Sequence, residues 1–184
     1  MHTMKLIKTK LDGVFLIKRE INIDSRGHFS RIFSKEYLDE LGCVLPIQQI
    51  NHSYTKSKST IRGLHYQSNP YADMKIVTCI RGKIFDVIVD LRKNSKTFLN
   101  FIEIELSEYN NHCVLIPEGF AHGFQTLIND CELIYLHSAK YCKIYESGVR
   151  YDDPTLNIIW PLKPNNISDR DLNLKYINEN YEGL

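Results

Sequence analysis

From about residue 45 to residue 137, apolar and polar positions follow the two-residue period of β-strands. Apolar and polar residues alternate cleanly in the segment Phe98–Leu106, and other segments are short apolar runs bounded by Gly, Pro, Asn or Asp. Arg81-Gly82 separates two such runs and is typical of a hairpin turn. Many short strands with closely spaced turns predict an all-β antiparallel sandwich or barrel. The predicted strands are IRGLHYQ (61–67), MKIVTCI (74–80), KIFDVIVDLR (83–92), FLNFIEIELS (98–107), HCVLIPEGF (112–120), FQTLI (124–128) and CELIYLH (131–137).

Only two segments have the pattern of helices, and both are short. Residues 34–42 begin with Ser34 as a possible N-cap and end with Gly42. Residues 168–181 begin with Ser168 and carry an acid three residues later, which is the spacing of a capping box. Because we find no internal repeat, linker or dinucleotide-binding glycine motif, we expect a single domain over residues 1–184 with a helical segment at about 167–184.

The composition is that of an ordinary globular protein, with 43% hydrophobic and 24% charged residues among 184. The net charge of +1 provides no basic field for nucleic acid. No apolar run reaches the ~18 residues that cross a membrane, and residues 1–10 lack the apolar stretch of a signal peptide. Five cysteines without a C-x-x-C pair favour reduced thiols. We therefore expect a cytoplasmic protein without nucleic-acid or membrane partners.

Several chemically active side chains lie on or beside the predicted strands. His65 lies within IRGLHYQSNP, Lys75 follows ten residues later, and His122 ends a P-x-G-x-x-H pattern. From the residues alone, His65 is either a hydrogen-bonded interior histidine or a proton-handling group that faces a cavity. Two isolated histidines without a third close ligand make a poor metal site, so we predict no metal.

Five motifs occur in an order that resembles the dTDP-4-dehydrorhamnose 3,5-epimerase family. They are RGLHYQ, GKIFDVIVDLRKNSKTF, LIPEGFAHGF, GVRYDDPTLNIIWP and ISDRD, and DSRGHFSRIF and QINHS match it as well. The resemblance covers about residues 5–173. It implies a cupin-type jelly-roll barrel, no cofactor, and a homodimer to which the N-terminal strand segment, about residues 1–45, contributes. It also implies a nucleoside-diphosphate 4-keto sugar as the substrate, inverted beside the ketone.

The same resemblance implies roles for individual residues. His65 would be the catalytic base, Asp171 its partner, Tyr135 the opposing acid, and Lys75 a further catalytic group. Asp171 has an alternative interpretation as a helix-capping acid, and Asp86 is expected in or behind the pocket. The expected substrate-binding residues are Arg26, Gln49, Asn51, Arg62, His122 and Tyr141, with His122 as a pocket wall or a structural residue.

Elementary chemistry is consistent with these roles. Removing a proton beside a ketone requires a base with a pKa near neutrality, and imidazole offers about 6.5 without perturbation. A carboxylate fixes the tautomer of the ring, a cation stabilises the enolate, and inversion needs an acid on the opposite face of the sugar.

Departures from the family pattern leave the substrate open. Arg31, Leu136 and Met74 replace residues common in the family, and the loop SNPYAD is unusual. The default expectation is epimerisation of dTDP-4-dehydro-6-deoxy-D-glucose at carbons 3 and 5, for deoxysugar and surface-polysaccharide synthesis. The alternatives are a monoepimerase or 3,4-ketoisomerase on another nucleotide-linked keto sugar, such as a GDP-linked heptose, and a non-catalytic sugar-binding jelly roll.

Overall fold

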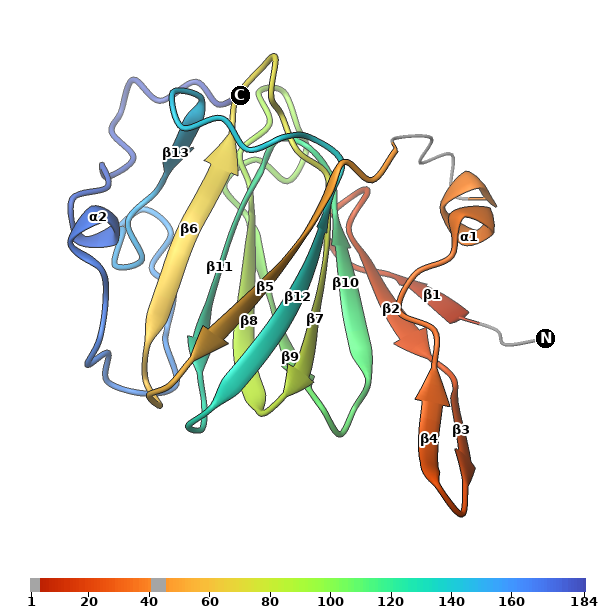
Figure 1. The fold of residues 1–184 in the computed structure, drawn as a ribbon. Helices are drawn as coiled ribbons and strands as arrows, with labels where there is room; N and C mark the ends of the chain where they lie inside the picture. Colours follow the sequence, from red (N-terminus) through yellow and green to blue (C-terminus); the bar gives the residue numbers. More distant parts are fainter. Residues whose placement is uncertain (1–3, 41–45) are drawn as a thin grey trace.

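The computed structural model describes residues 4–40 and 46–184, which form thirteen β-strands and two short helices (Figure 1). This confirms the predicted all-β class. The strands are β1 (Met4–Lys8), β2 (Phe15–Arg19), β3 (Ile21–Asp24), β4 (Gly27–Ser30), β5 (Gln49–Thr55), β6 (Ile61–Gln67), β7 (Lys75–Arg81), β8 (Lys83–Asp90), β9 (Phe101–Ser107), β10 (His112–Ile116), β11 (Phe120–Thr126), β12 (Cys131–His137) and β13 (Glu146–Gly148). The helices are α1 (Lys35–Glu40) and α2 (Asp169–Leu172), and neither is long or apolar enough to cross a membrane.

Most strands belong to two antiparallel sheets that face each other as the layers of a jelly roll (Figure 1). The strand order is β1-β2-β10-β7-β12-β5 in the six-stranded sheet and β13-β6-β11-β8-β9 in the five-stranded sheet. Strands β3 and β4 form a separate hairpin that projects away from both sheets (Figure 1). The architecture is the predicted cupin-type barrel.

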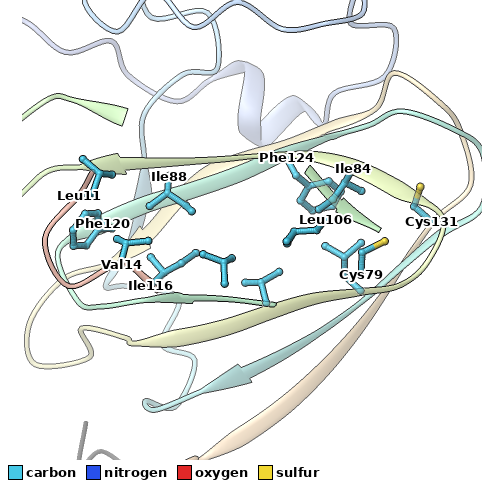
Figure 2. Close-up of a cluster of buried hydrophobic side chains, with 13 residues drawn as sticks. Leu11, Val14, Cys79, Ile84, Ile88, Leu106, Ile116, Phe120, Phe124 and Cys131 are labelled. Atoms are coloured by element: carbon cyan, nitrogen blue, oxygen red, sulfur yellow. The ribbon is translucent and has the colours of Figure 1, made fainter. Parts of the chain in front are cut away.

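The main core lies between the two sheets, where alternate residues of facing strands meet (Figure 2). Removing these side chains from water stabilises the fold by about 25 cal/mol for each Å² of apolar surface buried. Cys79 and Cys131 belong to this core, and burial raises the pKa of the Cys79 thiol to about 12. The buried cysteines thus behave as small apolar residues. The core residues are Leu11, Val14, Val77, Cys79, Ile84, Ile88, Leu106, Val114, Ile116, Phe120, Phe124, Cys131 and Leu133.

The outer face of the five-stranded sheet is also covered, which explains why β8 is apolar on both faces. Val87 and Val89 point away from the main core and pack against a second cluster that includes Leu156 and Tyr181. The chain after β13 therefore wraps over this sheet, and it carries α2 to the edge beside β6 (Figure 1).

The prediction of a hairpin at Arg81-Gly82 was wrong. Strand β7 pairs with β10 and β12, whereas β8 pairs with β9 and β11 in the other sheet. The chain passes between the sheets at Gly82, whose φ is +83° and where a Cβ would lie 2.7 Å from Cys131 Sγ. A tight corner between sheets and a hairpin turn both need glycine at a positive φ, so the local sequence does not separate them.

Two other predicted boundaries differ from the structure. The run 112–120 is divided into β10 and β11 by a turn in which Pro117 lacks a donor and Gly119 has φ +84°. The predicted strand 124–128 is the second half of β11 and ends at Thr126. Helix α1 begins where predicted, and its predicted end at Gly42 lies outside the described residues.

The helix predicted over 168–181 is a single turn, α2, so most of the segment 167–184 is not helical. Ser168 is its N-cap, as predicted, and Asn173 ends it. Beyond Asn173 the chain is extended enough for Lys175 to form a bridge with Val149 and for Ile177 to pack on the outer cluster. Packing on the sheet thus outweighs a weak helical preference.

Strands β6 and β11 approach each other closely at two glycines, and this contact yields a stability prediction. Gly63 has φ +117°, and a Cβ there would lie 2.6 Å from Gly123 Cα. We expect Gly63→Ala to lower the free energy of unfolding by roughly 2–6 kcal/mol, the sum of backbone strain and overpacking. Urea unfolding measures this change. Gly27→Ala is the control, because Gly27 has φ +132° but open space around it, so only the strain of about 1–3 kcal/mol applies. Equal losses in both variants would contradict the steric account.

Candidate active site

A cavity of about 970 Å³ opens among β5, β6, β7, β11, β12 and the segment that carries α2. Both sheets contribute to its wall, and it is therefore lined from two opposite sides. Nine of the ten predicted site residues line it: His65, Lys75, Tyr135, Asp171, Gln49, Asn51, Arg62, His122 and Tyr141.

His65 and Asp171 form a hydrogen-bonded pair at one side of the cavity. Nε2 of His65, on β6, lies 2.7 Å from Oδ1 of Asp171, on α2, although 106 residues separate them. The other carboxylate oxygen of Asp171 accepts a hydrogen bond from Gly63 N at 3.0 Å. Although burial opposes ionisation, the hydrogen bond from His65 and that from Gly63 hold the pKa of Asp171 at about 2. The carboxylate stays ionised at neutral pH and fixes the orientation of the ring.

The helix-capping interpretation of Asp171 applies to its backbone and not to its side chain. Asp171 N donates to Ser168 Oγ at 3.1 Å, which caps the helix. The carboxylate of Asp171 points to His65 and Gly63 instead. The side chain is therefore free to serve as the partner of the imidazole.

Tyr135 reaches the cavity from the opposite sheet. It lies on β12, in the six-stranded sheet, whereas His65 lies on β6, in the five-stranded sheet. Its hydroxyl is 3.3 Å from Ser53 Oγ, and its ring meets that of His122 edge-on. Burial raises the pKa of Tyr135, so the hydroxyl keeps its proton and can donate it. An imidazole and a protonated phenol thus face the cavity from opposite sides.

Lys75, on β7, is a buried lysine that lines the cavity. Its Nζ lies 3.7 Å from Asp73 Oδ2, and only 8% of the residue is exposed. Burial lowers the pKa of Lys75, and the nearby carboxylates of Asp73, Glu146 and Asp86 oppose that effect. An ammonium with little water around it stabilises a developing negative charge strongly.

His122 forms a second, more deeply buried histidine–carboxylate pair. Its Nε2 lies 2.7 Å from Oδ1 of Asp86 on the neighbouring strand β8, where Asp86 pairs with Phe124. Burial raises the pKa of Asp86, and the neighbouring His122 and Lys75 lower it in part. Within the described residues, Asp86 Oδ2 is buried without a hydrogen-bond partner. His122 is thus a fixed part of the cavity wall, and Asp86 lies behind it, as expected.

The described part of the chain holds no group of three or more His, Cys, Asp or Glu residues arranged to bind a metal ion.

Comparison with known proteins matches residues 8–179 to the family model for dTDP-4-dehydrorhamnose 3,5-epimerase. The chain belongs to this family. It is 39% identical to the dTDP-4-dehydrorhamnose 3,5-epimerase of Shigella flexneri over 180 residues, which cover 97% of this chain and 99% of that protein.

Solved structures of dTDP-4-dehydrorhamnose 3,5-epimerases have the same fold. The enzyme from Bacillus anthracis, crystallised with TDP and PPi bound, superposes with a TM-score of 0.92 at 39% identity, covering 95% of this chain and 100% of that one. The dTDP-6-deoxy-D-glucose-3,5-epimerase from Legionella pneumophila, in complex with dTDP-4-keto-L-rhamnose, has a TM-score of 0.91 at 36% identity, covering 95% and 93%.

Arg26 is the one predicted site residue that does not line the cavity. It lies at the tip of the β3–β4 hairpin, where its guanidinium forms an exposed ion pair with Asp24 at 2.6 Å. The hairpin projects away from the barrel that carries the cavity (Figure 1). A role for Arg26 in substrate binding thus requires the cavity of a second copy of the chain, and it stays a prediction.

Sequence reasoning missed several polar residues of the cavity wall, and four of them lie close to the proposed catalytic residues. Arg170 Nη2 lies 2.7 Å from His65 Nε2, and Arg170 Nη1 donates to Glu146 at 2.8 Å. Asp73 and His137 form the wall beside Lys75. Arg170 lies within the matched segment ISDRD and could have been considered. Asp73 lies in the loop SNPYAD, whose departure from the family pattern is a signal for this residue. The sequence around Glu146 and His137 contains no such signal.

Proposed function

We propose that this chain epimerises dTDP-4-dehydro-6-deoxy-D-glucose at carbons 3 and 5 to give dTDP-4-dehydro-L-rhamnose. The observation that carries the proposal is the placement of His65–Asp171 and Tyr135 on opposite sheets, with the cavity between them. This is the arrangement that inversion requires, because the proton must leave one face of the sugar and return to the other.

In the first step, the free imidazole of His65 removes the proton from a carbon beside the ketone. Asp171 holds the ring in place and stabilises the imidazolium that forms. The ketone oxygen gains the negative charge, and the ammonium of Lys75 stabilises this enolate from within the cavity wall.

In the second step, the hydroxyl of Tyr135 delivers a proton to the opposite face of the same carbon. Its raised pKa keeps it protonated until the enolate accepts the proton. The imidazolium of His65 then releases its proton to water and the phenolate of Tyr135 takes one up, after which repetition at the second carbon on the other side of the ketone completes the conversion. No cofactor is needed, because each step moves only a proton.

The rest of the cavity would bind the nucleotide portion of the substrate. Arg62 is fixed by hydrogen bonds to Thr55 Oγ1 at 3.0 Å and to the carbonyl of Tyr54 at 3.2 Å. A preorganised guanidinium of this kind suits a diphosphate. The same wall offers further polar and aromatic contacts from Gln49, Asn51 and Tyr141. Gln49 Oε1 accepts a hydrogen bond from Tyr141 N at 3.1 Å, which joins two of these residues.

We further propose that the protein acts in the cytoplasm as a homodimer. In this arrangement the N-terminal segment, about residues 1–45, contacts a second copy, and its β3–β4 hairpin brings Arg26 to the cavity of that copy. The exposed apolar side chains of Ile23 and Phe29 on the hairpin support this proposal, since a partner surface would remove them from water.

Turnover should persist after exhaustive chelation. The proposed steps use His65, Tyr135 and Lys75 as proton-handling and charged groups, and among the described residues no three His, Cys, Asp or Glu are grouped as a metal site requires. The measurement is the rate of product formation before and after dialysis against EDTA. A loss of activity that a divalent ion restores would contradict this mechanism.

The proposed function is tested by incubating the purified protein with dTDP-4-dehydro-6-deoxy-D-glucose and identifying the products by proton NMR. We expect the L-rhamno configuration, inverted at both carbons. Inversion at one carbon only would assign a monoepimerase, and turnover of a GDP-linked keto heptose alone would assign a different substrate. Binding without any conversion would leave a sugar-binding protein and overturn the proposal.

A further inference from the structure

The carboxylate of Asp73 has polar partners on both of its oxygens in the wall of the cavity. Its Oδ1 accepts hydrogen bonds from Ser138 N at 3.1 Å and from Ala139 N at 3.2 Å. Its Oδ2 lies 2.7 Å from His137 Nδ1 and 3.7 Å from Lys75 Nζ. Four groups thus converge on one carboxylate, of which only 4% of the side chain is exposed.

The position of Asp73 connects two of the proposed catalytic groups. His137 is opposite Lys75 in the register of β12 and β7, and its ring stacks on that of Tyr135, with centroids 6.0 Å apart and planes 17° apart. Asp73 therefore contacts Lys75 directly and supports Tyr135 through His137. The backbone bonds to residues 138 and 139 hold the carboxylate at this point.

We infer that Asp73 is a positioning residue, which keeps the ammonium of Lys75 charged and directed into the cavity. The inference rests on the proposed function of this site, in which Lys75 stabilises the enolate. It assigns a function to a residue of the loop between β6 and β7 for which the motifs of the chain give no role.

Lys75 needs such a partner because its surroundings disfavour the charge. Burial is the largest influence on Lys75 and lowers its pKa, and Asp73 provides the largest opposing influence. The other carboxylates that face it are Glu146 on β13 and Asp86 on β8. The neutral or titratable groups around it are His137 and Tyr135 on β12 and His122 on β11, which line the same cavity.

The asparagine variant isolates the charge of Asp73. In Asp73→Asn the amide oxygen still accepts from Ser138 N and Ala139 N, and the amide nitrogen can donate to His137 Nδ1. The loop should therefore keep its conformation, while Lys75 loses its nearest negative charge.

The expected effect is a change of pH profile rather than a uniform loss of activity. Lys75 is active when protonated, so kcat/KM falls as the pH rises through its pKa in the free enzyme. Burial lowers the pKa of Lys75 and raises the pKa of Tyr135, so Lys75 is the first of the two to lose its proton as the pH rises. In Asp73→Asn we expect this alkaline limb to move to lower pH by about 1 or more, the effect of one opposite charge at this range. At the lowest pH of the plateau, kcat/KM should approach that of the wild type.

A second measurement does not depend on turnover. The titration of Lys75 can be followed by NMR of protein labelled with ¹³C-lysine, with the Lys75 signal assigned by its absence in Lys75→Arg. It should move to lower pH in Asp73→Asn. Asp153→Asn is the matched control, because Asp153 is also buried and accepts hydrogen bonds from Thr155 N and Leu156 N in a loop, but lies outside the cavity. This control should leave both the alkaline limb and the Lys75 titration unchanged.

The two possible failures are distinguishable. A Lys75 titration that shifts while the wild type converts no keto sugar would overturn the proposed function and leave Asp73 as the partner of Lys75. Normal conversion by the wild type, with an unshifted titration and alkaline limb in Asp73→Asn, would overturn the role of Asp73. A uniform loss of kcat/KM at every pH would also overturn it, since that is the signature of a damaged fold.

Discussion

The His65→Asn variant is expected to lose uptake of solvent deuterium beside the ketone by about 100- to 10,000-fold, the usual contribution of a general base. An amide keeps some hydrogen bonding but cannot accept a proton near neutral pH. Asp171 would keep its bond from Gly63 N and remain in place. Binding of dTDP should change little, because the nucleotide contacts involve other residues. The measurement is mass spectrometry of the sugar nucleotide after incubation in heavy water, together with calorimetry for dTDP.

The control for this variant is His112→Asn. His112 lies on β10 and does not line the cavity, so the same exchange of imidazole for amide should leave deuterium uptake unchanged. Uptake near the wild-type rate in His65→Asn would remove His65 from the role of base. Loss of dTDP binding together with uptake would indicate a structural role instead.

The Tyr135→Phe variant is expected to retain deuterium exchange and to lose most of the epimerised product. Phenylalanine preserves the stacking on His137 and the contact with His122, so the fold should hold while the hydroxyl is lost. The enolate would still form through His65 and Lys75, and the imidazolium could return a deuteron to the face from which the proton came. Loss of a general acid costs about 100- to 10,000-fold in rate, so NMR of the product should show the defect plainly.

The control is Tyr71→Phe, since Tyr71 stacks on Tyr145 outside the cavity and should tolerate the same change. Near-normal inversion in Tyr135→Phe would mean that another group, such as Tyr141 or a bound water, reprotonates the far face. Loss of both exchange and inversion would point to Tyr135 as a group that stabilises the enolate.

The sequence predicted the strands well because a half-buried strand imposes a period of two. The alternation of Ile102, Ile104 and Leu106 reports the face that packs on the core, whatever the partner strands are. The choice of partner is not local, which is why the turn at Gly82 was misread as a hairpin when it joins two sheets. Likewise, the helical pattern of residues 168–181 does not indicate that Ile177 packs on the outer cluster, whereas the structure has only the single turn α2 in this segment.

The residues of the candidate site divide in the same way, into those that the sequence indicates and those that come together only through strand pairing. His65 and Asp171 lie within matched motifs, whereas Lys75 and Tyr135 were found through the family resemblance as a whole, and the structure brings all four to one cavity. Asp73 and His137 were missed because their contact joins residues 64 positions apart, through the pairing of β7 with β12. Which residues of two strands lie side by side depends on how the strands pair, and the residues near Asp73 in the sequence do not indicate that pairing.

The central claim is that His65 and Tyr135 act on opposite faces of the keto sugar, and the position of solvent deuterium tests it most directly. Wild-type protein would be incubated in heavy water with dTDP-4-dehydro-6-deoxy-D-glucose, and the product would be examined by NMR at each carbon. The account predicts a product inverted at carbons 3 and 5, with a solvent deuteron at both. Inversion without solvent deuterium, or deuterium at both carbons with the original configuration retained, would contradict it.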